Sequence, residues 1–289
     1  MPTVTVTVTD AEGHVSAPAS ASWTVQSAAK KVIGYWAPAA SYSSRLATVG
    51  PAGVKARRIY GNLTTAGTDM SSQIVAAHNA GMMPVVSYKL GSWSIAQGQS
   101  GAADAAADAT AAYLASFNKP TAVAIWHEPY DDMSGADFVA LQRRLVPFFK
   151  RGLLTVGPIL HGWLLDTAAN RTVFGTYLAD DLLPVYDYAG IDSYQTGSAS
   201  SPGSTGPGDR IAPLLSLLSA RGVPNIPIGV GEYNAFTAAM LRAASETFLS
   251  TPNLAWACMW DSTSGIAVQL SGDRLTAFQE TKADARAQQ

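Results

Sequence analysis

Two glutamates stand out in a chain with few charges. Glu128 ends the apolar run Ala-Ile-Trp-His-Glu, and Glu232 ends the run Ile-Gly-Val-Gly-Glu. Only 14% of the residues are charged, so each position is conspicuous. A carboxylate that follows a buried strand costs desolvation free energy unless a partner or a function offsets it. Two carboxyl groups held in different environments can act as a proton donor and as a nucleophile.

A carboxyl pair of this kind is what cleavage of a glycosidic bond requires. One group protonates the leaving oxygen while the other stays ionised and attacks the anomeric carbon. A separation of about 5–5.5 Å between the two groups indicates retention of configuration, and a wider gap indicates inversion. The alternative is structural: either glutamate forms a salt bridge to an arginine such as Arg57 or Arg58. An aromatic rim near both glutamates favours the catalytic interpretation.

The elements that must position these glutamates alternate along residues 30–289. Apolar runs predict eight strands, separated by stretches with helical patterning. The strands are expected at 32–36, 57–63, 83–90, 122–128, 153–160, 186–194, 226–232 and 254–260. The helices are expected at 71–79, 104–117, 134–151, 173–183, 211–221, 237–250 and 274–287. Eight parallel strands, each followed by a helix, over about 250 residues predict an α/β fold, a (β/α)8 TIM barrel.

In such a barrel the active site lies at the C-terminal ends of the strands. Five of the seven tryptophans lie at or just after a predicted strand end. Their flat faces can stack on sugar rings, and their N–H groups can bind hydroxyls. The candidate substrate-binding residues at these ends are Tyr35, Trp36, Asn62, Lys89, Trp93, His127, His161, Trp163, Tyr194, Tyr233 and Trp260.

Strand alternation makes a further prediction about the two glutamates. It places Glu128 on the face that carries Ala124 and Trp126, and Glu232 on the face that carries Ile228 and Val230. We expect both faces to point into the barrel, so that the two carboxyl groups converge across its mouth.

Acidic residues that end the fourth and seventh strands of a (β/α)8 barrel resemble clan A of the retaining glycoside hydrolases. The segment Trp-His-Glu-Pro is similar to glycoside hydrolase family 26, the family of β-mannanases and related endo-β-glycanases. The resemblance spans residues 31 to 285. It implies that Glu128 is the acid/base and Glu232 the nucleophile. It also implies that Tyr194 hydrogen-bonds the nucleophile, Trp260 floors the cleavage subsite, and His127 orients the sugar and the nucleophile.

The sequence therefore predicts a retaining endo-glycoside hydrolase that acts on a polysaccharide. The segment 129–132, Pro-Tyr-Asp-Asp, departs from the mannanase pattern, so mannan is not carried over as the substrate. A second hypothesis is a carbohydrate-binding or structural barrel without hydrolytic activity. A third is Schiff-base chemistry at Lys89, which the absence of a Gly-rich phosphate loop after the last two strands disfavours.

Composition narrows the expected partners and cofactors. A net charge of −2 gives no electrostatic footprint for nucleic acid. No apolar run approaches the roughly 18 residues that predict a membrane span. The single cysteine, Cys258, and four scattered histidines argue against a bound metal, and we expect no cofactor.

The N-terminal segment has a different texture from the rest of the chain. Residues 3–9 alternate threonine and valine, and residues 22–25 are expected to return as the second strand of a β-hairpin. We predict a boundary between residues 1–29 and a catalytic barrel over 30–289. The hairpin is either the remnant of an immunoglobulin- or fibronectin-like sandwich or an appendage packed on the barrel. The remnant would suit part of a larger extracellular or virion-associated protein, such as a phage tail component.

Overall fold

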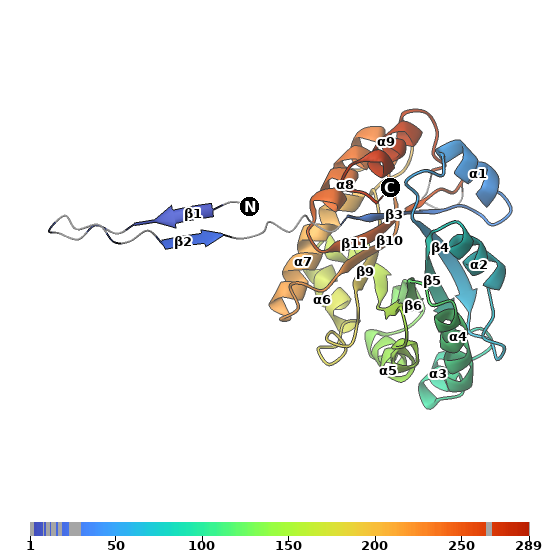
Figure 1. Ribbon diagram of the computed structural model, residues 1–289. Coiled ribbons are helices and arrows are strands. Elements are labelled where there is room, and N and C mark those ends of the chain that lie inside the picture. Colours follow the sequence, from blue (N-terminus) through green and yellow to red (C-terminus); the bar gives the residue numbers. More distant parts are fainter. Residues whose placement is uncertain are drawn as a thin grey trace.

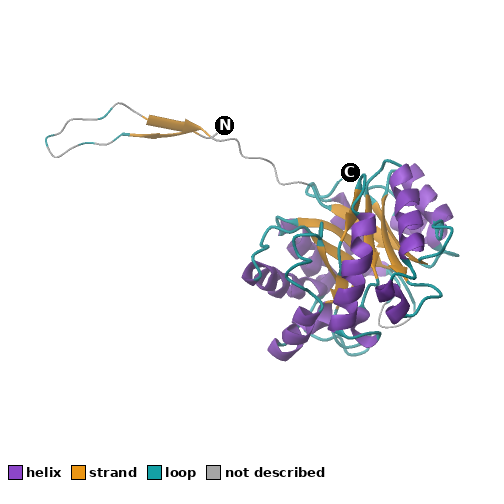
Figure 2. Cartoon of the chain, turned by 90° about the horizontal axis from the view of Figure 1, so that it is seen from below, coloured by secondary structure: helices purple, strands orange, loops and turns teal. Residues whose placement is uncertain are grey.

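The computed structural model describes residues 3–7, 9, 12, 16, 19–22, 30–263 and 268–288. A parallel sheet of nine strands curls on itself, with helices around its outside (Figure 1). Seen from below, the strands occupy the centre and the helices surround them (Figure 2). The predicted (β/α)8 fold is confirmed. Near the N-terminus, β1 (Thr3–Val6) pairs antiparallel with β2 (Ala19–Ser22). The predicted return strand at 22–25 falls mostly outside the described residues.

The strands run side by side in the order β7-β6-β5-β4-β3-β11-β10-β9-β8. Their bounds are Val32–Trp36 (β3), Ala56–Asn62 (β4), Met83–Lys89 (β5), Thr121–Ile125 (β6), Leu154–Val156 (β7), Ile159–His161 (β8), Ala189–Tyr194 (β9), Ile228–Asn234 (β10) and Leu254–Trp260 (β11). All pairs within this sheet are parallel.

The fifth barrel strand is divided into two short strands. One half pairs with the strand before it and the other half pairs with the strand after it, so the sheet closes into a barrel. β7 pairs with β6 and β8 pairs with β9, yet only Gly157 and Pro158 separate β7 from β8. Both ladders continue across the break, because Gly157 N–H donates to the Val123 carbonyl at 3.2 Å and Gly190 N–H donates to the Pro158 carbonyl at 2.8 Å. A Cβ on Gly157 would lie 2.1 Å from the Tyr188 carbonyl oxygen, so this crossing requires glycine. β7 and β8 together are one strand, which makes eight.

The helices match the predicted pattern with three differences. The predicted helix at 173–183 is wrong: α6 spans Ala168–Thr176, because Thr167 caps it by accepting from Asn170 N–H. The helix predicted over 134–151 stays α-helical only to Leu145, since Pro147 lacks an N–H and favours a tighter turn. The sequence analysis missed α1 (Tyr42–Val49) and the short α3 (Ile95–Ser100).

The remaining helices lie near their predicted ranges. They are α2 (Ser71–Asn79), α4 (Asp104–Ser116), α5 (Gly135–Leu145), α7 (Ile211–Ala220), α8 (Ala238–Ser250) and α9 (Gly272–Ala283). Short 3-10 turns are η1 (Pro129–Asp131), η2 (Val146–Phe149), η3 (Gly162–Leu165) and η4 (Pro207–Arg210). Within the described ranges, none of the helices combines the length and apolar character needed to cross a membrane.

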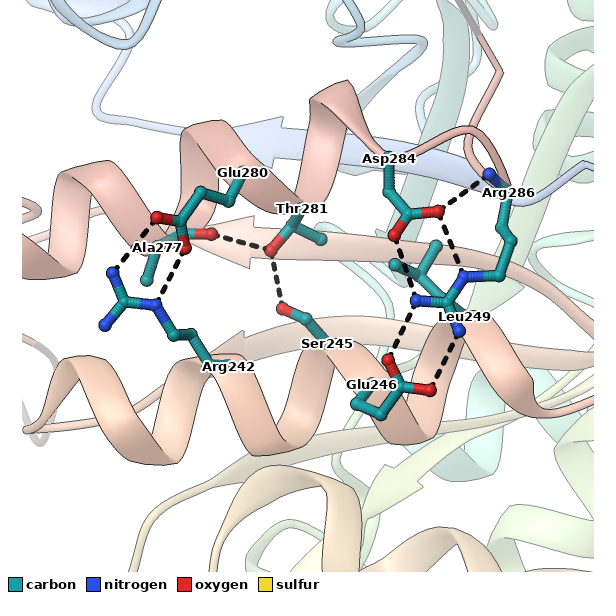
Figure 3. Close-up of a pocket in the computed structure, with 9 residues that line it drawn as sticks. All are labelled: Arg242, Ser245, Glu246, Leu249, Ala277, Glu280, Thr281, Asp284 and Arg286. Atoms are coloured by element: carbon teal, nitrogen blue, oxygen red, sulfur yellow. Dashed lines mark hydrogen bonds and ion pairs between the residues drawn. The ribbon is translucent and has the colours of Figure 1, made fainter.

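Neighbouring helices on the outside of the barrel are joined by ion pairs. Between α8 and α9, Arg242 pairs with Glu280 at 2.7 Å and Arg286 pairs with Glu246 at 2.8 Å (Figure 3). These side chains are largely exposed, so each pair contributes little free energy by itself. The small hollow between the two helices is therefore lined by side chains that already pair with one another.

Two apolar clusters divide the barrel into an outer and an inner core. The outer core lies between the sheet and the helices and includes Ile33, Ile125, Ile228 and Val230. The inner core fills the barrel with side chains from strands around its whole circumference: Ala56, Val85, Ala122, Ala124, Ile159, Tyr188, Trp256 and Cys258. Burial raises the pKa of the Cys258 thiol to about 12, so it stays protonated and inert. The inner core plugs the barrel below its mouth.

Candidate active site

Glu232 reaches the barrel mouth through a bulge in β10. Along β10, Val230 pairs with Ile191 but Glu232 already pairs with Asp192, so Gly231 is an extra residue in the ladder. The predicted grouping of Glu232 with Ile228 and Val230 is wrong, because those two side chains belong to the outer core. The bulge turns Glu232 away from their face. A Cβ on Gly231 would lie 2.3 Å from an Asp192 oxygen, so the bulge needs glycine there.

Three groups stabilise the Glu232 carboxylate. The Tyr60 hydroxyl donates to Oε1 and the Tyr194 hydroxyl donates to Oε2. The Arg58 guanidinium lies 3.9 Å from Oε1. Hydrogen bonds and a positive charge directed at a carboxylate favour its ionised form, although Glu232 is only 6% exposed. Burial together with the Glu232 charge raises the pKa of both phenols, so they remain protonated donors.

Glu128 reaches the mouth by a different irregularity. β6 ends at Ile125, and both Trp126 (φ 59°) and Glu128 (φ 50°) have left-handed backbone conformations. The predicted grouping of Glu128 with Ala124 and Trp126 is therefore wrong: Ala124 lies in the inner core, whereas Trp126 packs against the outer one. The Glu128 N–H donates to the Ile159 carbonyl at 2.9 Å and holds this turn on β8. Non-glycine residues in this region cost roughly 1–3 kcal/mol each, and such residues cluster at functional sites.

The environment of Glu128 favours its protonated form. Burial raises the pKa of this carboxyl most, and the nearby charge of Glu232 adds to the effect. Together they bring the pKa to about 8. Its nearest basic neighbour is His161, whose Nε2 lies 3.8 Å from Oε2. Burial lowers the pKa of His161, so this histidine is neutral and does not form a strong ion pair. The two glutamates are thus close enough for the charge of Glu232 to act on Glu128, and their surroundings differ.

His127 directly precedes Glu128 in the chain and approaches a hydrogen-bond donor to Glu232. Its ring is 5.0 Å from the ring of Tyr60. Burial first, and the Arg58 charge second, hold the pKa of His127 well below its usual value. Its Nδ1 is buried without a hydrogen-bond partner among the described residues. A neutral imidazole in this position can exchange hydrogen bonds with a sugar hydroxyl.

Aromatic side chains form two groups at the mouth. Trp36 and Trp260 stack face to face with centroids 3.5 Å apart, and Tyr60 stands edge-on to both. The second group is His161, Trp163 and a residue that the sequence analysis did not select, Tyr130. The Tyr130 and Trp163 rings are 5.1 Å apart and nearly perpendicular.

Lys89 and Asn62 line a hollow that the site residues Tyr60 and His127 also line. This cavity of about 330 Å³ is lined by Tyr60, Gly61, Asn62, Ser87, Lys89 and His127. Lys89 Nζ pairs with Asp132 at 2.8 Å, lies 4.9 Å from the Trp126 ring centroid, and its side chain is 42% exposed. A Schiff-base lysine needs burial to lose its proton near neutral pH, so the structure gives no support to that chemistry at Lys89.

Two of the predicted substrate-binding residues lie outside the site. Tyr35 and Tyr233 are completely buried in the outer core. Tyr35 donates its hydroxyl to Asp261, and the Tyr233 ring packs edge-on against Phe248 at 5.1 Å. Both side chains point outward because each directly adjoins a residue that points to the mouth. Trp93, in the loop after β5, packs partly against the outer core.

The sequence analysis also missed a buried polar layer beneath the glutamates. Arg58 is 1% exposed and donates to the Ser87 hydroxyl at 2.6 Å, and Asp192 is 2% exposed. Burial, followed by the charges of Glu232 and Glu128, raises the pKa of Asp192 well above its usual value. One buried guanidinium thus faces three carboxyl groups. This balance favours one ionised carboxylate and two protonated ones. The sequence did contain a sign of this layer, because polar residues alternate along β4 at Arg58, Tyr60 and Asn62.

Within the described ranges, no group of three or more histidine, cysteine, aspartate or glutamate side chains is arranged to hold a metal ion. The mouth of the barrel brings together two carboxyl groups in different environments, with aromatic side chains beside them.

Comparison with known proteins places this arrangement in a familiar fold. No protein-family model matches the chain. No curated protein matches it by sequence either. Among solved structures, an endo-beta-1,4-mannanase from Cellulomonas fimi of glycoside hydrolase family 26 is similar, with a TM-score of 0.60, 14% identity, and coverage of 89% of this chain and 71% of that one. The protein GH5_18 from Bifidobacterium longum subsp. longum matches with a TM-score of 0.59, 13% identity and coverage of 90% and 80%.

A chitinase from Bacteroides thetaiotaomicron shares the same architecture. Its TM-score is 0.57 at 12% identity, with coverage of 89% of this chain and 97% of that one. The structural neighbours thus include members of glycoside hydrolase families 5 and 26, in agreement with the resemblance noted from the sequence. At these identities the similarity establishes the (β/α)8 fold.

Proposed function

We propose that this protein is a retaining glycoside hydrolase that cleaves a polysaccharide, with Glu232 as the nucleophile and Glu128 as the acid/base. The observation that carries the proposal is the opposite environment of two neighbouring carboxyl groups. Glu232 accepts hydrogen bonds from Tyr60 and Tyr194 beside Arg58, whereas burial raises the pKa of Glu128 to about 8. Double displacement requires one carboxylate and one protonated acid, and these two environments suit Glu232 and Glu128 to those roles.

The first step forms a covalent glycosyl-enzyme. A Glu232 oxygen bonds to the anomeric carbon while the bond from that carbon to the leaving oxygen breaks. The Glu128 proton passes to the leaving oxygen, so the departing sugar leaves as a neutral alcohol and Glu128 becomes a carboxylate.

The second step restores the protein. The Glu128 carboxylate takes a proton from a water molecule as the water oxygen bonds to the anomeric carbon, and the ester to Glu232 breaks. Two inversions at one carbon give net retention. The phenol donors of Tyr60 and Tyr194 stabilise Glu232 each time it is released as a carboxylate.

The fold supports this proposal without fixing the substrate. The similar structures include an endo-beta-1,4-mannanase and a chitinase. We therefore expect a β-linked glycan, and the aromatic groups on both sides of the glutamates favour a chain over a single terminal sugar. Location outside the cell or on a virion remains a prediction from the sequence.

A glycan panel tests the proposal. The protein is incubated with β-mannan, mixed-linkage β-glucan, chitin and xylan, and new reducing ends are measured. NMR of the first-formed product then reports its anomeric configuration. We expect Glu232→Gln to abolish turnover and Glu280→Gln, on the remote helix α9, to leave it unchanged. Inverted product would overturn the mechanism, and glycan binding without any turnover would establish the non-hydrolytic alternative.

A further inference from the structure

One aromatic group at the mouth is not used by the mechanism. Tyr130, from η1, is 38% exposed, and Trp163, from η3, is 39% exposed. Large apolar side chains with this exposure are few among the described residues, yet these two lie together with ring centroids 5.1 Å apart at 85°. Apolar faces that stay in water beside a catalytic cleft indicate a ligand surface.

His161 links this pair to one of the two glutamates. Its ring lies 6.1 Å from the ring of Tyr130 and 6.1 Å from that of Trp163. Its Nε2 lies 3.8 Å from an oxygen of Glu128. The Tyr130–Trp163 pair therefore lies on the Glu128 side of the cleft.

The other aromatic group lies on the Glu232 side. Tyr60 donates a hydrogen bond to Glu232 and stands edge-on to the stacked pair Trp36 and Trp260. Trp36 covers one face of Trp260, so a sugar could stack only on the opposite face. The two aromatic groups thus flank the glutamates from opposite sides.

The chemistry of the two glutamates gives these sides different roles. The acid/base must reach the oxygen of the departing sugar, whereas the nucleophile must reach the anomeric carbon of the sugar that is retained. The acid/base side is therefore the leaving-group side. We propose, on the basis of the proposed function, that Tyr130 and Trp163 form the binding subsite for the sugar ring that leaves.

The geometry of the pair suits a pyranose ring. Two perpendicular aromatic rings form a corner, where one ring stacks on the C–H face of the sugar and the other closes its edge. Among the described residues, neither side chain forms a hydrogen bond with Glu128 or Glu232, so the pair would act through substrate position alone. A sugar held here and another held at Trp260 would lie on either side of the cleaved bond.

Two kinds of substrate separate the leaving-group subsite from the chemistry. The first is the β-1,4-linked pentasaccharide of mannose, glucose or N-acetylglucosamine, whichever the protein hydrolyses fastest. The second is the glycosyl fluoride of the same sugar with the β-configuration, whose leaving group is a single atom that fills no sugar subsite. Steady-state kcat/KM is measured for the wild type, Trp163→Ala, Tyr130→Ala, and the conservative Trp163→Phe. Leu153→Ala, which shortens an exposed side chain before β7 at the opposite end of the barrel, is the control.

We expect Trp163→Ala to lower kcat/KM for the pentasaccharide roughly tenfold or more, with hydrolysis of the fluoride unchanged. Tyr130→Ala should have a smaller effect of the same kind, and Trp163→Phe should recover part of the loss. An equal loss on both substrates, or no loss on the pentasaccharide, would overturn the subsite. A wild type that hydrolyses neither substrate would instead refute the proposed function.

Discussion

The strand ends that carry Glu128 and Glu232 solve one problem in two ways. Each must turn a carboxyl group from the direction of its strand toward the barrel mouth. In β10 an extra glycine shifts the register, and Glu232 meets two phenol donors and a guanidinium. After β6 the backbone becomes left-handed, and Glu128 meets a neutral histidine, while burial and the Glu232 charge outweigh the positive charges of Arg58 and Lys89. In each case the backbone irregularity determines which side chains surround the carboxyl group, and those side chains influence whether it is charged.

The largest loss of activity is expected when the proposed proton donor, Glu128, is replaced. Glu128→Gln keeps the shape of the side chain but has no proton to give to the leaving oxygen. We expect kcat/KM on an oligosaccharide to fall by about 10²–10⁴. Hydrolysis of the glycosyl fluoride should fall far less in the first step, because fluoride departs without protonation.

A burst of released fluoride followed by a slow steady state would match this expectation, since Glu128 must also act as the base in the second step. Equal losses on the two substrates would show that Glu128 does not serve as the acid.

A second prediction concerns the donors to Glu232. Tyr60→Phe removes one hydrogen bond to the carboxylate and leaves the ring that faces Trp260. Hydrogen bonds to charged groups contribute about 1.5–3 kcal/mol, so we expect kcat to fall about 10- to 100-fold.

The matched control for this substitution is Tyr188→Phe. That tyrosine is buried in the inner core and donates to the Val123 carbonyl at 2.7 Å instead of to a glutamate. Its loss should lower the melting temperature and spare kcat. If Tyr60→Phe lowers only the melting temperature, the hydroxyl has a structural role alone.

The smallest expected effect tests the protonation balance of the buried layer. With a pKa of about 8 for Glu128, activity should decline as pH rises through that value, because the deprotonated form cannot donate. Asp192→Asn replaces a protonated acid with a neutral group of similar shape. The basic limb of the profile of kcat/KM against pH should therefore move by only a few tenths of a unit.

If the basic limb of the pH profile of Asp192→Asn moved clearly to lower pH, the proposed protonation of Asp192 would be contradicted. Such a shift would mean that the wild-type Asp192 is charged and helps to hold the proton on Glu128. Glu246→Gln, on the outer surface of α8, provides the comparison profile.

Much of this architecture was predictable from the sequence, because continuous apolar runs mark strands that are covered on both faces. The positions of Glu128 and Glu232 at strand ends followed directly. Their orientation did not, since simple alternation assumes a regular backbone, and both strands depart from it where function is concentrated. Tyr35 and Tyr233 were chosen by proximity along the chain, whereas a strand sends adjacent side chains to opposite faces.

Arg58 and Tyr60 show the opposite error. Both occur in a strand whose alternating polar residues point into the barrel, so the pattern was present in the sequence. Arg58 was considered only as a structural ion-pair partner, because arginines are rarely buried so completely. The buried layer could be recognised only once β4, β9 and β10 had been placed beside one another.

The divided fifth strand gives the barrel a seam. Each half has only three residues, so few main-chain bonds hold the wall together there. Glu128 is tied to one half through the Ile159 carbonyl, and His161 ends that same half. A local opening of β8 would therefore displace Glu128 and the neighbouring pair of Tyr130 and Trp163. The proposed glycan path would thus run beside the one strand of the wall that is divided in two.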